Sequence, residues 1–353
     1  MARELKIATF NVEWMVNLFK PNRPELLTGP NERTAGLGAK PKDPEGVANR
    51  IAAVIQAVDA DILGICEGPP LKTQMQRFAE QKLGNDYRVY SMEDGAQSVH
   101  ALVHKRVNHG ITITQLPRND KVYERLRMVR TFHKFGDVKD AQKGRFTRLP
   151  VILRLKRKGK TTDVMIVHTK SKISALTKPS QWENKDRNAV ISAILSRQKL
   201  SIEMNVIRKY IAHRLYSANA QGVIVMGDLN DGVTRDIVDE NYLLHSAVHE
   251  LRGAFHHDLA LMRHVLNGRQ LQRKRDAWTA EFKDPHKGGR NTRVLLDHMI
   301  FSPACHDGGR ICFVKDSGRV EHTAYDRHVD GKGASRDERP SDHKPLSARF
   351  VLV

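Results

Sequence analysis

Short apolar segments alternate with helix-like segments along the whole chain of 353 residues. Four of the apolar segments have the length and composition of buried strands: KIATFNVEW (6–14), DILGICEG (61–68), DVMIVH (163–168) and VIVMG (223–227). Asp43 can cap a helix that begins at Pro44, and a long, broken helical pattern covers about 184–217. This mixed order predicts one α/β domain over 1–353, with sheets in the centre, helices outside, and insertions near 15–44, 115–146 and 240–293.

Polar residues that can perform acid–base or metal chemistry follow six of the apolar segments. They are Asn11, Glu67, His168, the pair Asp228 and Asn230, Asp297, and the pair Asp342 and His343. In layered α/β folds, ligand sites form where the loops at one edge of the sheets meet. We therefore expect these side chains to share a pocket, although they are spread from position 11 to position 343.

This set of side chains suits metal-assisted hydrolysis of phosphodiesters. A hard cation such as Mg²⁺ binds oxygen ligands and keeps several waters, so one or two carboxylates suffice, and Glu67 is the main candidate. A general base needs an imidazole held by a carboxylate, which His343 and Asp297 could supply. His168 and the amide of Asn230 could stabilise charge that develops on the phosphoryl oxygens.

Six short motifs occur along the chain in a fixed order: FNVEW, ICEG, VHTKSK, GDLND, LLDH and PSDHKPL. Together they resemble the endonuclease/exonuclease/phosphatase superfamily, whose members include DNase I, exonuclease III, the apurinic endonucleases and the sphingomyelinases. The resemblance covers nearly the whole chain. It implies a four-layer α/β sandwich, in which two central mixed sheets are flanked by helices.

The resemblance also implies a metal site. It places Mg²⁺, with Mn²⁺ as the alternative, at Glu67, and it adds contributions from Asn11 and Asp342. It further implies that Asp228 orients or activates the attacking water. Whether Asp228 or His343 is the general base stays open at this point.

Phosphate contacts follow from the same resemblance. It implies that Asn230 holds the phosphate and that Asp297 pairs with His343. Arg148, in FTRLPVILRLK, stands where several of these families carry a phosphate-contacting arginine. The apurinic endonucleases and exonuclease III have a tyrosine where this chain has His168, so the match favours the DNase I and sphingomyelinase branches over an abasic-site specialist.

The charge of the chain indicates a polyanionic partner. Lys and Arg number 59 against 40 Asp and Glu, which leaves a formal net charge of +19 at pH 7, and nucleic acid would relieve the self-repulsion. The basic segments 118–148 and 263–293 are predicted to be loop-like insertions whose cations contact backbone phosphates. Lys170 and Lys172, next to His168, are further candidates for substrate binding.

These features predict a Mg²⁺-dependent nuclease of low sequence specificity, with DNA as the favoured substrate. Two alternatives stay open. A phosphodiesterase or phosphatase for a lipid head group or a small phosphate ester would need an apolar hairpin for membrane docking, which we do not find in the sequence. A non-catalytic nucleic-acid-binding module would not need a chemically competent residue at every candidate position.

The cellular compartment is predicted from the small number of cysteines and from the apolar runs of the sequence. Three cysteines, Cys66, Cys305 and Cys312, have no spacing typical of a disulfide framework or a zinc site, which favours a reducing environment. No apolar run resembles a signal-peptide core or a membrane-spanning helix. We therefore expect a cytoplasmic protein without a membrane partner, and the oligomeric state stays open.

Overall fold

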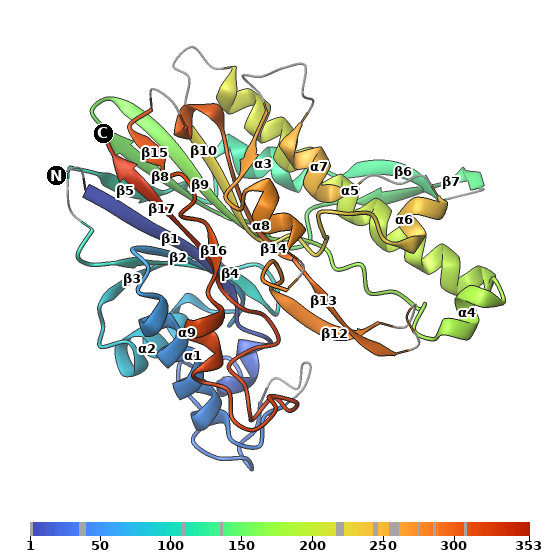
Figure 1. Ribbon diagram of the computed structural model, residues 1–353, viewed down its shortest axis with the longest axis horizontal. Helices are drawn as coiled ribbons and strands as arrows, with labels where there is room; N and C mark the ends of the chain where they lie inside the picture. Colours follow the sequence, from blue (N-terminus) through green and yellow to red (C-terminus); the bar gives the residue numbers. More distant parts are fainter. Residues whose placement is uncertain are drawn as a thin grey trace.

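The computed structural model of the chain contains two large mixed β-sheets that lie face to face, with helices on their outer faces (Figure 1). The structure describes residues 3–34, 40–107, 110–134, 137–216, 222–242, 246–253, 261–273, 275–284, 287, 289–306 and 309–353. This architecture confirms the expected α/β class and its layered sandwich. The division into one domain with three insertions stays a prediction.

The first sheet is centred on two parallel strands, β1 and β2. Its order is β15 (Ile311–Phe313), β17 (Leu346–Leu352), β1 (Arg3–Asn11), β2 (Ile62–Gly68), β4 (Ser98–His104) and β3 (Tyr87–Met92), and β16 (Arg319–Val320) also pairs with β17. The outer face is covered by α1 (Pro44–Val58), α2 (Lys72–Lys82) and α9 (His322–Asp326). The side chain of Asp43 caps α1 by accepting the Gly46 N–H, as the sequence predicts.

The second sheet is centred on the parallel strands β9 and β10. Its order is β11 (Arg263–His264), β14 (Asp297–Phe301), β10 (Gly222–Asp228), β9 (Lys160–His168), β8 (Val151–Arg157) and β5 (Thr112–Gln115). Its outer face packs against α3 (Lys121–Arg127), α5 (Arg187–Leu215) and α7 (Ala247–Arg252). The helical pattern predicted over about 184–217 corresponds to α5, but the predicted break was wrong, because α5 is one continuous helix of 29 residues. The short α4 (Pro179–Glu183) precedes it.

The two sheets share one hydrophobic layer. Ile62 and Ala101 of the first sheet belong to the same buried cluster as Ile166 and Met226 of the second. Gly64 in β2 permits the close approach, because a Cβ atom at this position would lie 2.7 Å from a side-chain carbon of Ile166. The ends of β1, β2, β9 and β10 are thereby held near one another.

Two hairpins project from the sandwich (Figure 1). They are β6–β7 (Arg130–Lys134 and Asp137–Gly144) and β12–β13 (Ala280–Asp284 and Arg290–Val294), and the short helices α6 (Ile237–Asn241) and α8 (Gly268–Gln272) complete the described elements. The prediction that the basic segments 118–148 and 263–293 are loop-like was wrong, because the first contains α3 and β6–β7 and the second contains β11, α8 and β12–β13. A hairpin with two solvated faces lacks the apolar alternation by which strands are found in a sequence. Across the described ranges, no helix is both long and apolar enough to cross a membrane.

Candidate active site

The ends of five strands bring the predicted residues together. Asn11 ends β1, and Glu67 lies one residue before the end of the parallel strand β2. His168 and Asp228 end the parallel strands β9 and β10 and are partners in the register, and Asp297 begins β14 opposite Asp228. Parallel neighbours end at the same edge of a sheet, and the stacking of the sheets aligns the two edges. The structure thus brings these residues to one edge of the two sheets, as the sequence predicts.

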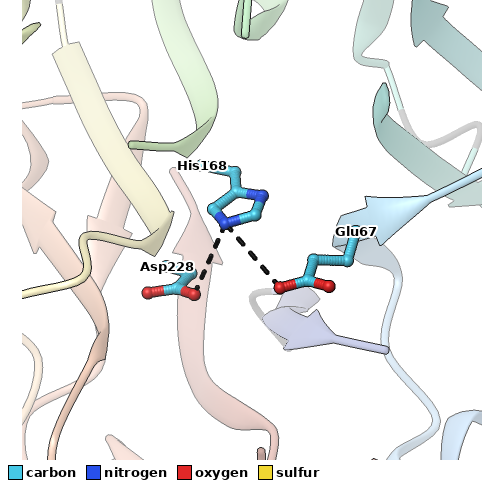
Figure 2. Close-up of side chains that lie close together, drawn as sticks. All are labelled: Glu67, His168 and Asp228. Carbon is cyan, nitrogen blue, oxygen red and sulfur yellow. Dashed lines mark ion pairs between the residues drawn. The ribbon is translucent and has the colours of Figure 1, made fainter. Parts of the chain in front are cut away.

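Glu67, His168 and Asp228 form a group that could hold a cation (Figure 2). His168 Nε2 lies 3.9 Å from Glu67 Oε1 and 3.7 Å from Asp228 Oδ2, and the ligand atoms of the three residues all lie within 4.8 Å of one another. These nitrogen–oxygen distances are too long for hydrogen bonds. Adjacent ligands around one ion with bonds of about 2.1 Å lie roughly 3 Å apart, so the three side chains would have to move slightly closer to share a cation. The donor set fits a divalent cation.

Asn11 faces this group with its amide nitrogen. Its Nδ2 donates to Glu67 Oε1 at 3.2 Å and to Asp228 Oδ2 at 2.9 Å, while its Oδ1 accepts the Glu13 N–H at 3.0 Å. In this arrangement Asn11 orients both carboxylates and offers no oxygen to a cation. Its predicted role as a metal ligand would require the amide to turn over, so that role stays a prediction.

The other oxygen of Glu67 is held by two donors. Glu67 itself has a left-handed backbone (φ 56°), and its Oε2 accepts the Trp14 N–H at 2.9 Å and the Gln97 amide at 2.7 Å. Gln97 is buried one residue before β4, and its Oε1 accepts a hydrogen bond from the Arg148 guanidinium at 3.3 Å. Gln97 thus connects the candidate metal-binding carboxylate with the candidate phosphate ligand. The sequence analysis missed this residue, because a glutamine in a turn before a strand carries no functional signal.

His343 and Asp297 form the predicted pair. His343 Nδ1 lies 2.6 Å from Asp297 Oδ2, and His343 Nε2 lies 4.0 Å from Asp228 Oδ2. The Ser341 hydroxyl accepts the His343 N–H and donates to the carbonyl of Asn11, which fixes this loop to the end of β1. Burial opposes a charge on His343, but the carboxylates of Asp297, Asp342 and Asp228 outweigh it and raise the pKa of His343 well above its usual value. The imidazole is therefore protonated at neutral pH.

Two further pKa values differ from their usual range. Burial raises the pKa of the Asp228 carboxyl to about 7, although the His343 charge and the donors at Asn11 and Asn230 act in the opposite direction. Burial lowers the pKa of His168 well below its usual value, and the charges of Arg148, His343 and Lys170 lower it further. His168 is therefore neutral, and its buried Nδ1 has no hydrogen-bond partner among the described residues. Perturbed acids and bases of this kind gather at functional sites.

Arg148, Lys170 and Asn230 surround the group. Arg148 donates to the Thr169 carbonyl at 3.4 Å, and Asn230 donates to the same carbonyl through Nδ2 at 2.9 Å. The Asn230 N–H donates to Asp228 Oδ1 at 2.8 Å. Burial and the nearby cations Arg148 and Lys199 lower the pKa of Lys170. Mutually repelling cations that form no salt bridge with another described residue indicate a place for an anion.

Lys172 and Asp342 are not brought into the group. The ammonium of Lys172 lies 2.5 Å from Asp231, 2.6 Å from Asp239 and 3.2 Å from Asp236, so it is enclosed by carboxylates that already compensate its charge. Its predicted substrate contact would require these ion pairs to break. Asp342 lies 4.0 Å from His343 Nε2 and its side chain is 40% exposed. Its predicted role in metal binding stays a prediction.

The sequence analysis also missed Glu203, a carboxylate in the middle of α5. It is 0% exposed and accepts the backbone N–H groups of Thr147 and Lys170, each at 2.6 Å. A sequence signal did exist, because an acid at 203 shares its helical face with Leu200 and Ile207. Acids on the buried face of a helix are rare unless a partner holds them.

Comparisons with known proteins show the fold. No family model and no curated protein matches the sequence. TDP2 from C. elegans is 15% identical, with 99% of this chain and 75% of that chain covered and a TM-score of 0.52. D. rerio TDP2 complexed with single strand DNA product is 12% identical, with 98% of each chain covered and a TM-score of 0.50.

A third structure carries the family's own description. It is an endonuclease/exonuclease/phosphatase family protein from Bacteroides thetaiotaomicron, 14% identical over 100% of this chain and 96% of that chain, with a TM-score of 0.47. These identities are too low to transfer an activity. At TM-scores of 0.52 and 0.50 over nearly the whole chain, the two TDP2 structures show that this chain has the same fold as they have.

Proposed function

We propose that this chain is a metal-dependent nuclease that hydrolyses phosphodiester bonds of nucleic acid, with DNA as the favoured substrate and little sequence specificity. The observation that supports it most is the shared position of Asp228. Its Oδ2 lies within 4.0 Å of both His168 Nε2 and His343 Nε2, so the cation-binding group and the His343–Asp297 pair act on the same small volume.

The metal would be held by the carboxylates of Glu67 and Asp228, with His168 Nε2 as the third donor. When bound, a divalent cation there would polarise a phosphoryl oxygen and offset its negative charge. Mg²⁺ is the proposed ion, because hard cations take carboxylate oxygens. Direct ligation by the imidazole would favour Mn²⁺ over Mg²⁺, so the rates with the two ions report on His168.

The chain's own residues account for the proton transfers. Asp228 orients the attacking water and takes its proton as the new P–O bond forms. His343 keeps Nδ1 on Asp297, so Nε2 is the nitrogen free to give a proton to the leaving oxygen as the old P–O bond breaks. Arg148, Lys170 and Asn230 bind the phosphoryl oxygens, where charge develops.

Nucleic acid is favoured as the substrate by charge and by fold. The net charge of +19 suits a polyanion, and a protein of the same fold, D. rerio TDP2, has been seen with a single strand DNA product. The test is one gel series with supercoiled plasmid, linear duplex, single-stranded DNA and RNA, each with Mg²⁺, Mn²⁺ or EDTA. Metal-dependent cleavage of DNA is expected. Cleavage of a small phosphodiester alone would overturn the choice of substrate, and nucleic-acid binding without any cleavage would favour the non-catalytic alternative.

A further inference from the structure

Glu203 occupies an unusual place between two strands of the second sheet. The ladder between β8 and β9 ends with Val151 opposite Ile166. If this antiparallel register continued by four residues, Thr147, before β8, would lie opposite Lys170, after β9. The N–H groups of these two residues instead donate to the two oxygens of Glu203, Thr147 to Oε1 and Lys170 to Oε2, each at 2.6 Å.

The Glu203 carboxylate therefore takes the place of direct backbone hydrogen bonds between the two segments at this point. It joins the segment before β8 to the segment after β9, and α5 supplies it from the outer face of the sheet. A carboxylate that accepts two backbone N–H groups forms strong, charge-assisted hydrogen bonds. It also keeps the two segments at a separation that direct pairing would not produce.

The two segments carry site residues. Arg148 follows Thr147 directly, and His168 precedes Lys170 by two positions. Within the part of the chain that the structure describes, the Arg148 guanidinium donates two long hydrogen bonds, 3.4 Å to the Thr169 carbonyl and 3.3 Å to Gln97. The direction of its side chain thus depends on where the backbone at 147–148 is held.

We propose that Glu203 is a positioning residue that holds Arg148 and Lys170 in the places from which they bind the scissile phosphate. This inference rests on the proposed function. Both oxygens of Glu203 are needed for the role, because a glutamine could accept one of the N–H groups with its oxygen but would turn its own NH₂ group toward the other.

The main test is a double-mutant cycle between Glu203→Gln and Arg148→Ala, measured as kcat and KM on a single-stranded oligonucleotide. We expect Glu203→Gln to lower kcat/KM roughly 10- to 100-fold, as loss of an orienting partner does at other sites. Adding Glu203→Gln to Arg148→Ala should cost less than Glu203→Gln costs alone, since part of its effect acts through Arg148 and only the part that acts through Lys170 remains. Defects that multiply would overturn the proposal.

The matched control is Glu321→Gln, which removes another buried carboxylate. Glu321 lies 2.7 Å from Lys6 and 3.2 Å from Arg319 and accepts a hydrogen bond from Ser347 at 2.6 Å, so its described side-chain partners include no site residue. It measures the general cost of losing a buried acid. A kcat/KM in Glu203→Gln equal to that of Glu321→Gln would reduce Glu203 to a structural role.

A second readout is independent of turnover. Backbone amide hydrogen exchange, followed by mass spectrometry in EDTA, should rise at 147–148 and 169–170 in Glu203→Gln and stay unchanged there in Glu321→Gln. If exchange were unchanged in both variants and the wild-type protein were active, the proposal for Glu203 would be overturned and the proposed function would stand. A wild-type protein that neither cleaves nor binds nucleic acid would remove the proposed function, and this inference with it.

Discussion

His343 and Asp297 pair through Nδ1 and Oδ2 at 2.6 Å, although they are 46 positions apart in the chain. Both side chains are buried, and Asp297 is held in place because its N–H donates to the Thr279 hydroxyl. The second oxygen of Asp297 has no hydrogen-bond partner among the described residues. The carboxylate is therefore available to His343 and to little else.

If this pair acts as a unit, its single and double variants should be equally impaired. We expect His343→Ala and Asp297→Asn each to lower kcat by roughly 10²- to 10⁴-fold, the usual contribution of acid–base catalysis. The double variant should be little slower than the slower single variant. Steady-state kinetics on one oligonucleotide measure all three, and independent, multiplying losses would separate the two residues.

Glu67→Gln should abolish metal-dependent turnover. The change removes one carboxylate charge from the cation-binding group at nearly constant volume, while the amide oxygen can still accept the Trp14 N–H. Circular dichroism should show an intact fold, and calorimetric titration with Mn²⁺ should show weakened binding. Undiminished cleavage at saturating Mg²⁺ would exclude Glu67 as the central ligand.

The stability of the metal-free protein should depend on Asp228 as pH changes. The carboxyl has a pKa of about 7 when folded, against 3.8 for the free group, so between these values the folded state holds a proton that the unfolded state has lost. Asp228 therefore lowers stability progressively as pH rises through this window, and the full cost persists above it.

Asp228→Asn removes that cost. In EDTA its melting temperature should exceed that of the wild-type protein at pH 8 by several degrees, and the difference should shrink toward pH 4. Differential scanning calorimetry at the two pH values measures the effect. A variant that is less stable than the wild type at pH 8 would contradict a buried, costly carboxylate.

Gln97→Leu should weaken metal binding and phosphate binding together. It removes the donor at Glu67 Oε2 and the acceptor at Arg148 in one step. Orienting partners of metal ligands typically contribute roughly 10- to 100-fold in affinity or activity, so the Mn²⁺ concentration for half-maximal rate should rise by that factor. If the metal requirement were unchanged and KM were raised, Gln97 would act on Arg148 alone and not on the metal site.

Removing positive charge from α3 should weaken nucleic-acid binding and leave the turnover of bound substrate unchanged. Tyr123 and Leu126 anchor the helix, while Lys121 and Arg125 are exposed. Replacing both cations by Gln should weaken binding to all duplex sequences alike, and the salt dependence of log K should become shallower by roughly 0.9 per lost phosphate contact.

The control for this change replaces Lys72 and Arg77 by Gln on α2, which covers the other sheet (Figure 1). Fluorescence anisotropy at several salt concentrations compares the two variants. Equal effects of the two changes would show a diffuse attraction of the whole molecule. Normal binding by the α3 variant would remove this helix from the nucleic-acid interface.

The sequence by itself determined the strands and the residues at their ends. Glu67, His168 and Asp228 could be selected because a polar residue that follows a buried apolar run is a local pattern, and because parallel strands end at a common edge. The cap of α1 and the presence of the long helix α5 were local in the same sense. Such features depend on neighbouring residues alone.

Only the tertiary structure decided which polar groups meet. Lys172 looks like a phosphate ligand in the sequence, yet it lies among three carboxylates from the loop after β10 and from α6. Gln97 and Glu203 carry no motif, yet they hold Glu67 and the backbone beside Arg148. Hydrogen bonds and ion pairs are short-ranged and directional, so their partners are set by the packing of distant segments, which no local pattern records.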